Sequence, residues 1–399
     1  MSKQAVILAG GKGTRLGSLT RDTPKPLLEV GGRPFLSYLV EEVRRFGFND
    51  IVVLSGPFQE KFERWRTVDN PAGVRIRIVP EPHPAGTAGA LHFAADMLAP
   101  EFLLLNGDSF FDFNLLDLVL RGGQAGHEAA IALREVEDVS RYGAVTLNGA
   151  NIQEFGEKSS SGPGLINGGI YLLRREVLDE ISGQPCSLEN DVLPALVKRG
   201  VVGGFKYSGN FIDIGTPEDF RRVGGIFGEW LRRPAAFLDR DGTINRDFGY
   251  VHRPDDFEWI PGAMAAIKFL NDHGYLVFVV TNQAGIARGY YDPEDVEALH
   301  LWINEELRKQ GAHIDRFYYC PHHPEAGTEK YTTRCDCRKP APGMVRAALS
   351  EWRIVAERSF MIGDRETDVE AARAGGIRGA LFDGSNLLTA IENLSEDPE

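Results

Sequence analysis

The fold is decided by two stretches of sequence, Leu8-Ala-Gly-Gly-Lys-Gly-Thr-Arg-Leu16 near the start of the chain and Phe237-Leu-Asp-Arg-Asp-Gly-Thr-Ile-Asn245 past its middle. Each stretch continues a short apolar run of the kind that forms a buried parallel strand. A glycine-rich loop after a strand lets the backbone approach phosphate groups closely, whereas paired aspartates at a strand end suit a covalent phosphoryl intermediate. The two stretches therefore predict two phosphate-handling sites of different chemistry in one chain.

Length and composition agree with two globular domains. The chain has 399 residues, of which 43% are hydrophobic and 25% are charged. A single hydrophobic core usually stops growing at about 250–300 residues, so two domains are expected. The net charge of −13 repels polyanions, which argues against nucleic acid as a partner. The apolar run Ala5–Ala9 is too short for a signal segment or a membrane span, so we expect a cytoplasmic protein without membrane contact; a homo-oligomer stays open.

Short β-branched runs alternate with amphipathic stretches in both halves of the chain. This is the pattern of βαβ units, and it predicts an α/β fold with mostly parallel sheets. Between residues 129 and 171 the pattern becomes strand-rich, so we expect a mixed sheet in the first half. We place the first domain at residues 1–222, a linker at 223–234 and the second domain at 235–399. The β-branched runs and amphipathic stretches that form this pattern are Ala5–Leu8, Phe35–Phe46, Ile51–Leu54, Ile76–Val79, Leu91–Leu98, Phe102–Leu105 and Ala235–Leu238.

Charged residues near the first glycine-rich loop are those that a triphosphate needs. Arg15 and Lys25 supply cations, and the chain carries two further acidic candidates, Asp108 and Asp213. Each feature also has a purely structural reading: the loop can be a tight turn, Asp108 a turn residue, and Asp213 the cap of a following helix. Their joint occurrence favours a binding site. The positions expected to bind the nucleotide within the loop are Gly10, Gly11, Gly13 and Thr14.

These residues form part of a longer pattern, from Ala5 to about Phe220, that resembles the sugar-phosphate nucleotidyltransferases. The resemblance implies in-line attack of a sugar 1-phosphate oxygen on the α-phosphorus of a nucleoside triphosphate, with release of pyrophosphate. It implies that Asp108 and Asp213 hold Mg²⁺ and that Arg15 stabilises the leaving pyrophosphate. The other implied contacts are Lys25 and Lys158 with phosphates, and Glu157 and Asn167 with sugar hydroxyls; Glu157 and Lys158 can also be read as a solvated loop. The motifs are Thr23-Pro-Lys-Pro-Leu-Leu28, Asn106-Gly-Asp108, Glu157-Lys158, Asn167-Gly-Gly169 and Asp213-Ile-Gly-Thr-Pro217.

The choice of base and sugar rests on two further segments. Residues 81–90 resemble the base-binding loop of the guanylyltransferase branch, so Glu81, Gly86 and Thr87 are expected at the nucleotide. A carboxylate such as Glu81 can accept hydrogens from N1 and N2 of guanine, a pattern that adenine, uracil and thymine do not offer. The segment Ser18-Leu-Thr20 resembles the heptose 1-phosphate guanylyltransferases. The expected substrates are therefore GTP and heptose 1-phosphate, with mannose 1-phosphate as the alternative sugar.

In the second half, the run Ala235–Leu238 predicts a buried strand that carries Asp239 and Asp241 to its carboxyl end, where open α/β sheets bind ligands. Asp239 can attack a phosphorus atom as nucleophile. Asp241 can protonate the leaving alcohol and later activate water. The competing reading is a β-hairpin with Asp-Gly at its turn.

Three later elements argue against the hairpin: Thr281-Asn282, Lys339, and Gly363-Asp364 with Asp368. With Asp239 they resemble the four motifs of the haloacid dehalogenase superfamily. The resemblance implies a second Rossmann-like domain, with Thr281, Asn282 and Lys339 at the phosphoryl group. Asp368 is either a supporting carboxylate or an acid placed early in a helix. The expected Mg²⁺ ligands are Asp239, Asp241 and Asp364.

Three of the four cysteines are clustered, and with a histidine they form two metal-binding knuckles. Cys320-Pro-His322 and Cys335-Asp-Cys337 match a closed tetrahedral Zn²⁺ site, with His323 as the fallback ligand and a Cys335/Cys337 redox pair as the alternative. Four protein ligands leave no open position, so we expect the zinc to support structure and to fix the loop that carries Arg338 and Lys339.

The region from Phe237 to about Ala374 resembles the heptose 1,7-bisphosphate 7-phosphatases, with the histidinol-phosphate phosphatases as close relatives. Arg288 and Arg338 are then expected to hold the remaining 1-phosphate, unless they are surface charges. The phosphatase would turn heptose 1,7-bisphosphate into the heptose 1-phosphate that the first domain needs. The alternatives are a mannose 1-phosphate guanylyltransferase fused to a different phosphatase, and a chain in which one half is a non-catalytic nucleotide sensor.

Overall fold

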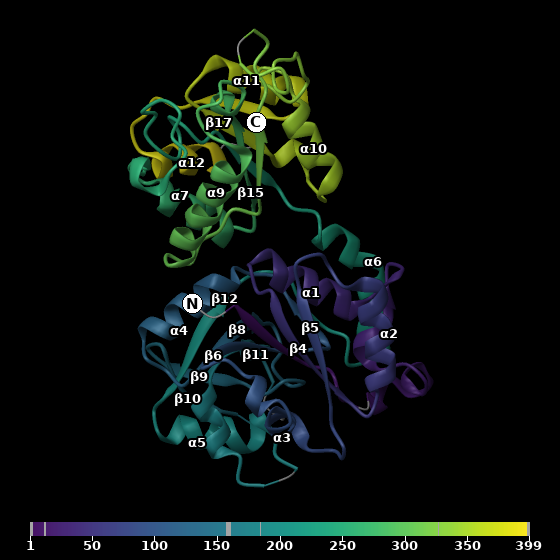
Figure 1. The fold of residues 1–399 in the computed structure, drawn as a ribbon. Coiled ribbons are helices and arrows are strands. Elements are labelled where there is room, and N and C mark those ends of the chain that lie inside the picture. Colours follow the sequence, from purple (N-terminus) through teal and green to yellow (C-terminus); the bar gives the residue numbers. More distant parts are fainter. Residues whose placement is uncertain (1–2, 12, 157–160, 184, 326, 397–399) are drawn as a thin grey trace. The chain divides into compact units, whose positions relative to one another are not determined.

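The computed structural model describes residues 3–11, 13–156, 161–183, 185–325 and 327–396. The chain divides into two compact units, Met1–Glu229 and Trp230–Glu399, which Figure 1 shows as ribbons. Each unit is an α/β structure with its own sheet and its own core, as the alternating pattern of the sequence predicts.

The N-terminal unit is built on a mixed sheet (Figure 1). β1 (Gln4–Leu8) pairs in parallel with β4 (Asp50–Gly56) and β6 (Glu101–Asn106), and β11 (Gly164–Arg174) pairs antiparallel with β6. The antiparallel pairing begins in the strand-rich region, as expected. The strand order is β5-β4-β1-β6-β11-β8-β12-β10-β9, where the strands not yet given are β5 (Arg75–Pro80), β8 (Ala129–Val136), β9 (Val145–Asn148), β10 (Asn151–Phe155) and β12 (Val202–Tyr207).

Helices bury both the sheet and one another in this unit. Apolar residues of β1, β4, β6 and β8 pack in one cluster with α3 (Gly86–His92) and α5 (Leu193–Lys198). Phe227 of α6 (Pro217–Trp230) contacts the rings of Phe35 and Tyr38 in α1 (Phe35–Arg45), with centroids 5.8 and 4.9 Å apart. The remaining helices of the unit are α2 (Gln59–Asp69) and α4 (Leu115–Gln124).

Two boundaries differ from the sequence prediction. The helix expected at residues 91–98 begins earlier, as α3 at Gly86, because the carbonyl of Cys186 accepts the backbone N–H groups of Ala88 and Gly89 in its first turn. The expected linker at 223–234 is helical as far as Trp230, since α6 continues through it to bury Phe227.

The C-terminal unit has a parallel sheet with helices on both faces (Figure 1). Alternate residues of β14 (Ala235–Leu238) enter different cores: Ala236 and Leu238 pack with α7, α9 and α12, whereas Ala235 and Phe237 pack with α10 and α11. The strand order is β16-β15-β14-β17-β18. The bounds are β15 (Leu276–Asn282), β16 (Arg316–Cys320), β17 (Phe360–Gly363), β18 (Arg378–Leu381), α7 (Ala263–Asp272), α9 (Pro293–Arg308), α10 (Gly343–Glu351), α11 (Glu366–Gly375) and α12 (Leu387–Glu396).

The register of the parallel strands explains why the predicted phosphatase residues meet. Leu238 pairs with Val279 in β15 and with Ile362 in β17. The residues that follow these pairs therefore lie together at the carboxyl edge of the sheet. Because β14 has parallel partners on both sides, the alternative hairpin reading of Asp239 to Asp241 is wrong.

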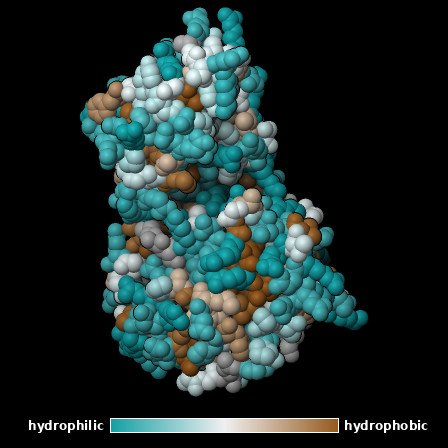
Figure 2. Space-filling view, in the orientation of Figure 1, coloured by the Kyte–Doolittle hydropathy of each residue, from teal (hydrophilic) through white to brown (hydrophobic). Residues whose placement is uncertain are grey.

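Figure 2 shows that hydrophilic residues cover most of the visible face of each unit, with apolar residues in smaller groups. Within the described ranges, no helix is long and apolar enough to cross a membrane.

Candidate active sites

The first glycine-rich loop leaves β1 and closes against the next strands. A side chain at Gly10 would meet the carboxylate of Glu81 and the backbone of Gly56, so the close approach of these three residues requires glycine. Gly13 has a φ of 57° and begins the short helix Thr14–Thr20, whose Thr20 hydroxyl donates a hydrogen bond to the Gly13 carbonyl. The side chain of Thr14 lies outside what the structure describes.

This loop borders a cavity of about 710 Å³ in the N-terminal unit. A cavity of that size can take a nucleotide. Of the cations that line it, Arg15 is exposed and Lys25 is buried. The predicted site residues that line the cavity are Gly10, Gly11, Gly13, Arg15, Lys25, Glu81, Gly86, Thr87 and Asp108.

The predicted metal ligands of this site face each other across Lys25. The Nζ atom of Lys25 lies 2.6 Å from a carboxylate oxygen of Asp108 and 3.4 Å from one of Asp213. β7 (Ser109–Phe111) and β13 (Phe211–Asp213) pair antiparallel, which brings the two aspartates together. Burial, followed by repulsion from Asp108, raises the pKa of Asp213. Two carboxylates that repel each other and share one ammonium group form a donor set that suits a divalent cation.

The helix that follows Asp213 has its own cap. The hydroxyl of Thr216 accepts the backbone N–H of Asp219 in the first turn of α6. The reading of Asp213 as the cap of this helix is therefore wrong, and its carboxylate faces Lys25 instead.

Glu81, the residue expected to read the base, lines this cavity. Its carboxylate is half-buried, and burial raises its pKa although the backbone N–H groups of Ala85 and Gly56 donate hydrogen bonds to it. A carboxylate can accept about four hydrogen bonds, so two donors leave it able to accept more from a ligand in the cavity.

Glu189 also lines this cavity, although it belongs to no motif that singled it out. The hydroxyl of Thr87 donates to one carboxylate oxygen at 2.9 Å, and that of Tyr171 donates to the other at 3.3 Å. The hydroxyl of Thr87 thus fixes the carboxylate of Glu189 by a hydrogen bond. The amide of Asn167 is also engaged, because its nitrogen donates to Tyr171 and its oxygen accepts the backbone N–H of Gly169. Asn167 is not among the residues found to line the cavity, and Glu157 and Lys158 lie outside the described residues.

In the C-terminal unit, Asp239 and Lys339 form the centre of the second site. The Nζ atom of Lys339 lies 2.7 Å from Asp239 and 2.6 Å from Asp368. Burial, opposed by Lys339 and reinforced by repulsion from Asp368, raises the pKa of Asp239 to about 7. Burial alone would lower the pKa of Lys339, but the two carboxylates raise it. The lysine is therefore a fixed positive charge beside the expected nucleophile.

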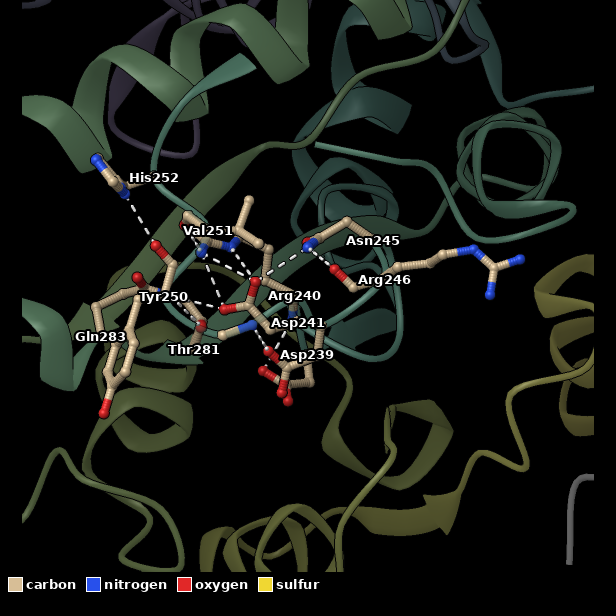
Figure 3. A network of polar contacts seen from close by, with 12 residues as sticks. Asp239, Arg240, Asp241, Asn245, Arg246, Tyr250, Val251, His252, Thr281 and Gln283 are labelled. Carbon is tan, nitrogen blue, oxygen red and sulfur yellow. Dashed lines mark hydrogen bonds and ion pairs between the residues drawn. The ribbon is translucent and has the colours of Figure 1, made fainter. Parts of the chain in front are cut away.

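A group of carboxylates able to hold a divalent cation surrounds this centre. Within the part of the chain that the structure describes, it consists of Asp239, Asp364 and Asp368, whose oxygens lie within 4.8 Å of one another. The donor set suits Mg²⁺. Asp241, expected among the ligands, does not contribute its side chain, because its carboxylate is turned towards Arg240 and Gln283 (Figure 3). The third carboxylate of the group is that of Asp368 instead.

Two residues at the end of β15, Thr281 and Asn282, were predicted at the phosphoryl group. The amide of Asn282 is paired with the backbone of Lys339: its nitrogen donates to the Lys339 carbonyl and its oxygen accepts the Lys339 N–H. Thr281 is buried, and its hydroxyl accepts a hydrogen bond from Gln283. Asn282 therefore positions the lysine, and Thr281 borders the cavity.

A cavity of about 360 Å³ opens beside Asp239, and cations line one part of it. These are Arg288, Arg338 and Arg365, and His323 lines the same cavity. His323 is partly buried, and its pKa is lowered by this burial and by the positive charges of Arg338 and Arg288. The positive charge beyond the expected nucleophile fits a second anionic group on the substrate. Arg365 was not predicted for this site, and His323 was predicted only as the fallback zinc ligand, because both positions depend on which loops meet.

The four predicted zinc ligands converge. Cys320, His322, Cys335 and Cys337 lie with their donor atoms within 4.8 Å of one another, and the three sulfur atoms are 3.2–3.5 Å apart. The Nδ1 atom of His322 is 3.4 Å from the Cys337 sulfur. Three thiolates and one imidazole in this arrangement fit a tetrahedral zinc site. The guanidinium of Arg338 donates to the His322 carbonyl at 3.1 Å, so the cluster also fixes an arginine of the cavity.

Replacing Cys335 by Ser is expected to reduce bound zinc from about one ion per chain to nearly none, because a hydroxyl is a poor substitute for a thiolate. Metal analysis of the purified protein measures this. Cys186→Ser is the matched control, since Cys186 is a buried free cysteine of the N-terminal unit. Undiminished zinc in the Cys335 variant would contradict the assignment.

Comparisons with known proteins agree with this division of the chain. Residues 4–225 match the nucleotidyl transferase family, and residues 336–395 match the HAD-hydrolase-like family. The crystal structure of HddC from Yersinia pseudotuberculosis complexed with GMP-PN superposes on 56% of this chain and 99% of its own, with a TM-score of 0.51 and 32% identity.

The second half is similar to curated phosphatases. The D-glycero-beta-D-manno-heptose-1,7-bisphosphate 7-phosphatase of Rhodopseudomonas palustris is 50% identical over 163 residues, which are 41% of this chain and 91% of that protein. The enzyme of the same name from Escherichia coli K12 is 46% identical over 165 residues, or 41% and 86% of the two chains.

The fold and the two sites thus define a bifunctional enzyme, a nucleotidyltransferase joined to a phosphatase of the haloacid dehalogenase type. The chain belongs to the nucleotidyl transferase family through residues 4–225 and to the heptose-1,7-bisphosphate 7-phosphatase family through its C-terminal half.

Proposed function

We propose that this enzyme removes the 7-phosphate of D-glycero-D-manno-heptose 1,7-bisphosphate and transfers GMP from GTP to the resulting heptose 1-phosphate, releasing pyrophosphate. The observation that carries the proposal is the pair of arginines, Arg288 and Arg338, that line the same cavity as Asp239. A monophosphate needs no second cationic group, whereas a bisphosphate does. The product keeps a 1-phosphate, which is the nucleophile that the cavity beside Arg15 and Lys25 would need.

In the phosphatase site, a carboxylate oxygen of Asp239 attacks the 7-phosphorus, and the bond from phosphorus to the C7 oxygen breaks. Asp241 gives the leaving oxygen a proton. Asp241 then takes a proton from water, which attacks the aspartyl phosphate and frees inorganic phosphate. Lys339, 2.7 Å from Asp239, neutralises charge during both displacements. Mg²⁺ held by Asp239, Asp364 and Asp368 would supply further positive charge at the phosphoryl oxygens.

In the nucleotidyltransferase site, the backbone of Gly10, Gly11 and Gly13, which lines the cavity, would hold the triphosphate. Lys25 and Arg15 would neutralise the charge that develops on the α-phosphate and on the leaving pyrophosphate. Mg²⁺ held by Asp108 and Asp213 would neutralise phosphate oxygens. An anionic Glu189 in the same cavity suits hydroxyl groups rather than phosphates, so it would face a sugar.

The proposal is tested by incubating the protein with each anomer of heptose 1,7-bisphosphate, GTP and Mg²⁺, and following phosphate, pyrophosphate and GDP-heptose. Phosphate should appear before pyrophosphate, because the second reaction needs the product of the first. Histidinol phosphate and mannose 1-phosphate serve as competing substrates. A faster reaction with either would contradict the assignment of the corresponding domain.

Replacing Glu81 by Gln is expected to lower kcat/KM for GTP by about 10-fold to 100-fold, because an amide offers one acceptor and presents a donor to guanine N1 and N2. The rate with ATP should change little. Initial rates with GTP, ATP, CTP and UTP measure the effect as a loss of selectivity. An enzyme that prefers ATP before any substitution would defeat the assignment of Glu81.

A further inference from the structure

The carboxylate of Asp241 is held by three neighbouring side chains (Figure 3). Nη2 of Arg240 lies 3.0 and 2.9 Å from its two oxygens. Nδ2 of Asn245 donates to Oδ1 at 3.0 Å, and Nε2 of Gln283 donates to Oδ2 at 3.0 Å. Both oxygens are therefore fixed from more than one direction, which leaves the carboxylate little rotational freedom.

Arg240 has no exposed surface, although it neighbours two aspartates in an active site. A buried arginine is costly unless its charge is paired and its donors are used. Besides Asp241, its Nη2 contacts the Val251 carbonyl at 2.5 Å. Val251 follows Tyr250, which lines the phosphatase cavity and has a φ of 58°. Arg240 therefore joins the expected proton donor to the loop that borders the substrate cavity.

Gln283 also contacts the carboxylate of Asp241. Its buried Nε2 donates to Asp241 and also to the hydroxyl of Thr281 at 2.9 Å. The hydroxyl of Tyr291 donates to its Oε1 at 2.7 Å. This last bond fixes the orientation of the amide, so that the donor group and not the acceptor faces the carboxylate. The ring of Tyr291 is stacked on His252, with centroids 4.6 Å apart and planes 14° apart.

We propose that Arg240 and Gln283 are positioning residues that hold Asp241 in place for proton transfer. The proposal rests on the phosphatase function argued above, in which Asp241 serves as acid and base. Both residues also connect Asp241 to residues 250–252: Arg240 does so through the Val251 carbonyl, and Gln283 through Tyr291 and His252. A substrate that fixes this loop against the cavity thereby fixes the proton donor as well. General acid and base groups depend on such placement, since a small displacement from the reacting atoms greatly reduces the rate.

The test is a double-mutant cycle on the release of the 7-phosphate. Gln283→Met and Arg240→Met remove the donors at similar size, and each is made alone and combined with Asp241→Asn. We expect each single variant to lower kcat about 10-fold to 100-fold with KM changed less than about twofold. In the Asp241→Asn background, measured at higher enzyme concentration, the same substitutions should cause no further loss. Tyr291→Phe should give an intermediate kcat.

Gln310→Met is the matched control, because Gln310 is exposed in the same unit. Zinc content and the unfolding temperature show whether each variant is folded. If Arg240→Met does not fold, the kcat values of Gln283→Met and Tyr291→Phe test the proposal. Unchanged kcat in folded variants, or an equal loss with and without the Asp241 carboxylate, would overturn the proposal. Absence of phosphate release from the unsubstituted enzyme would instead refute the proposed phosphatase function.

Discussion

Replacing Asp239 by Asn is expected to reduce phosphate release at least about 10⁴-fold, while GMP transfer to supplied heptose 1-phosphate continues at its normal rate. Asparagine keeps the size of the side chain but cannot form the aspartyl phosphate. It also removes one of the carboxylates that surround Lys339. Transfer should survive because its predicted residues belong to the other compact unit.

The measurement is phosphate release from heptose 1,7-bisphosphate, with pyrophosphate release from heptose 1-phosphate and GTP followed separately. Asp272→Asn is the control, because Asp272 is exposed and pairs with Lys268 one turn earlier in α7. If both activities disappeared in a folded protein, the two sites could not be independent. If phosphate release persisted, Asp239 would not be the nucleophile.

Replacing Lys25 by Met is expected to have the complementary effect, with a loss of pyrophosphate release of about 10²-fold to 10³-fold and no change in phosphate release. The Nζ atom of Lys25 separates Asp108 from Asp213. Without it the two carboxylates repel each other, and a positive charge that the α-phosphate needs is lost. The pKa of Asp213, already raised by burial and by Asp108, should rise further.

Single-turnover measurement of pyrophosphate release at saturating GTP separates the loss of catalysis from a loss of binding. Lys198→Met is the control, since Lys198 is exposed at the end of α5 in the same unit. A variant that binds GTP weakly but reacts at the normal rate once saturated would show that Lys25 serves ground-state binding alone.

The fold could be predicted from the sequence because apolar strand runs recur along the chain and the motif residues lie at the ends of these runs. Asp239, Thr281 and Asp364 each follow or end an apolar run, and parallel strands bring such positions to one edge of a sheet. The zinc ligands could be predicted for a similar reason, since closely spaced donors such as Cys335 and Cys337 have few other arrangements.

Side-chain direction could not be predicted in this way. Asp241 was expected at the metal, yet its carboxylate faces Arg240 and Gln283, because a buried arginine next to it in sequence needs a counter-charge. Glu189 reaches its cavity only because Thr87 and Tyr171, far away in sequence, donate to it. Both outcomes depend on contacts between distant segments, which no local pattern records.

The short path from the zinc cluster to the catalytic lysine has a consequence for how this chain can change over time. Cys337, Arg338 and Lys339 are consecutive, and they serve the metal cluster, the cationic part of the cavity and the nucleophile in turn. An insertion or deletion between Cys335 and Lys339 would displace at least one of these groups. Most of the described residues between the knuckles are exposed, and surface loops tolerate changes of length better than the elements that they connect. Homologous chains should therefore differ in loop length before Cys335 and keep the spacing after it unchanged.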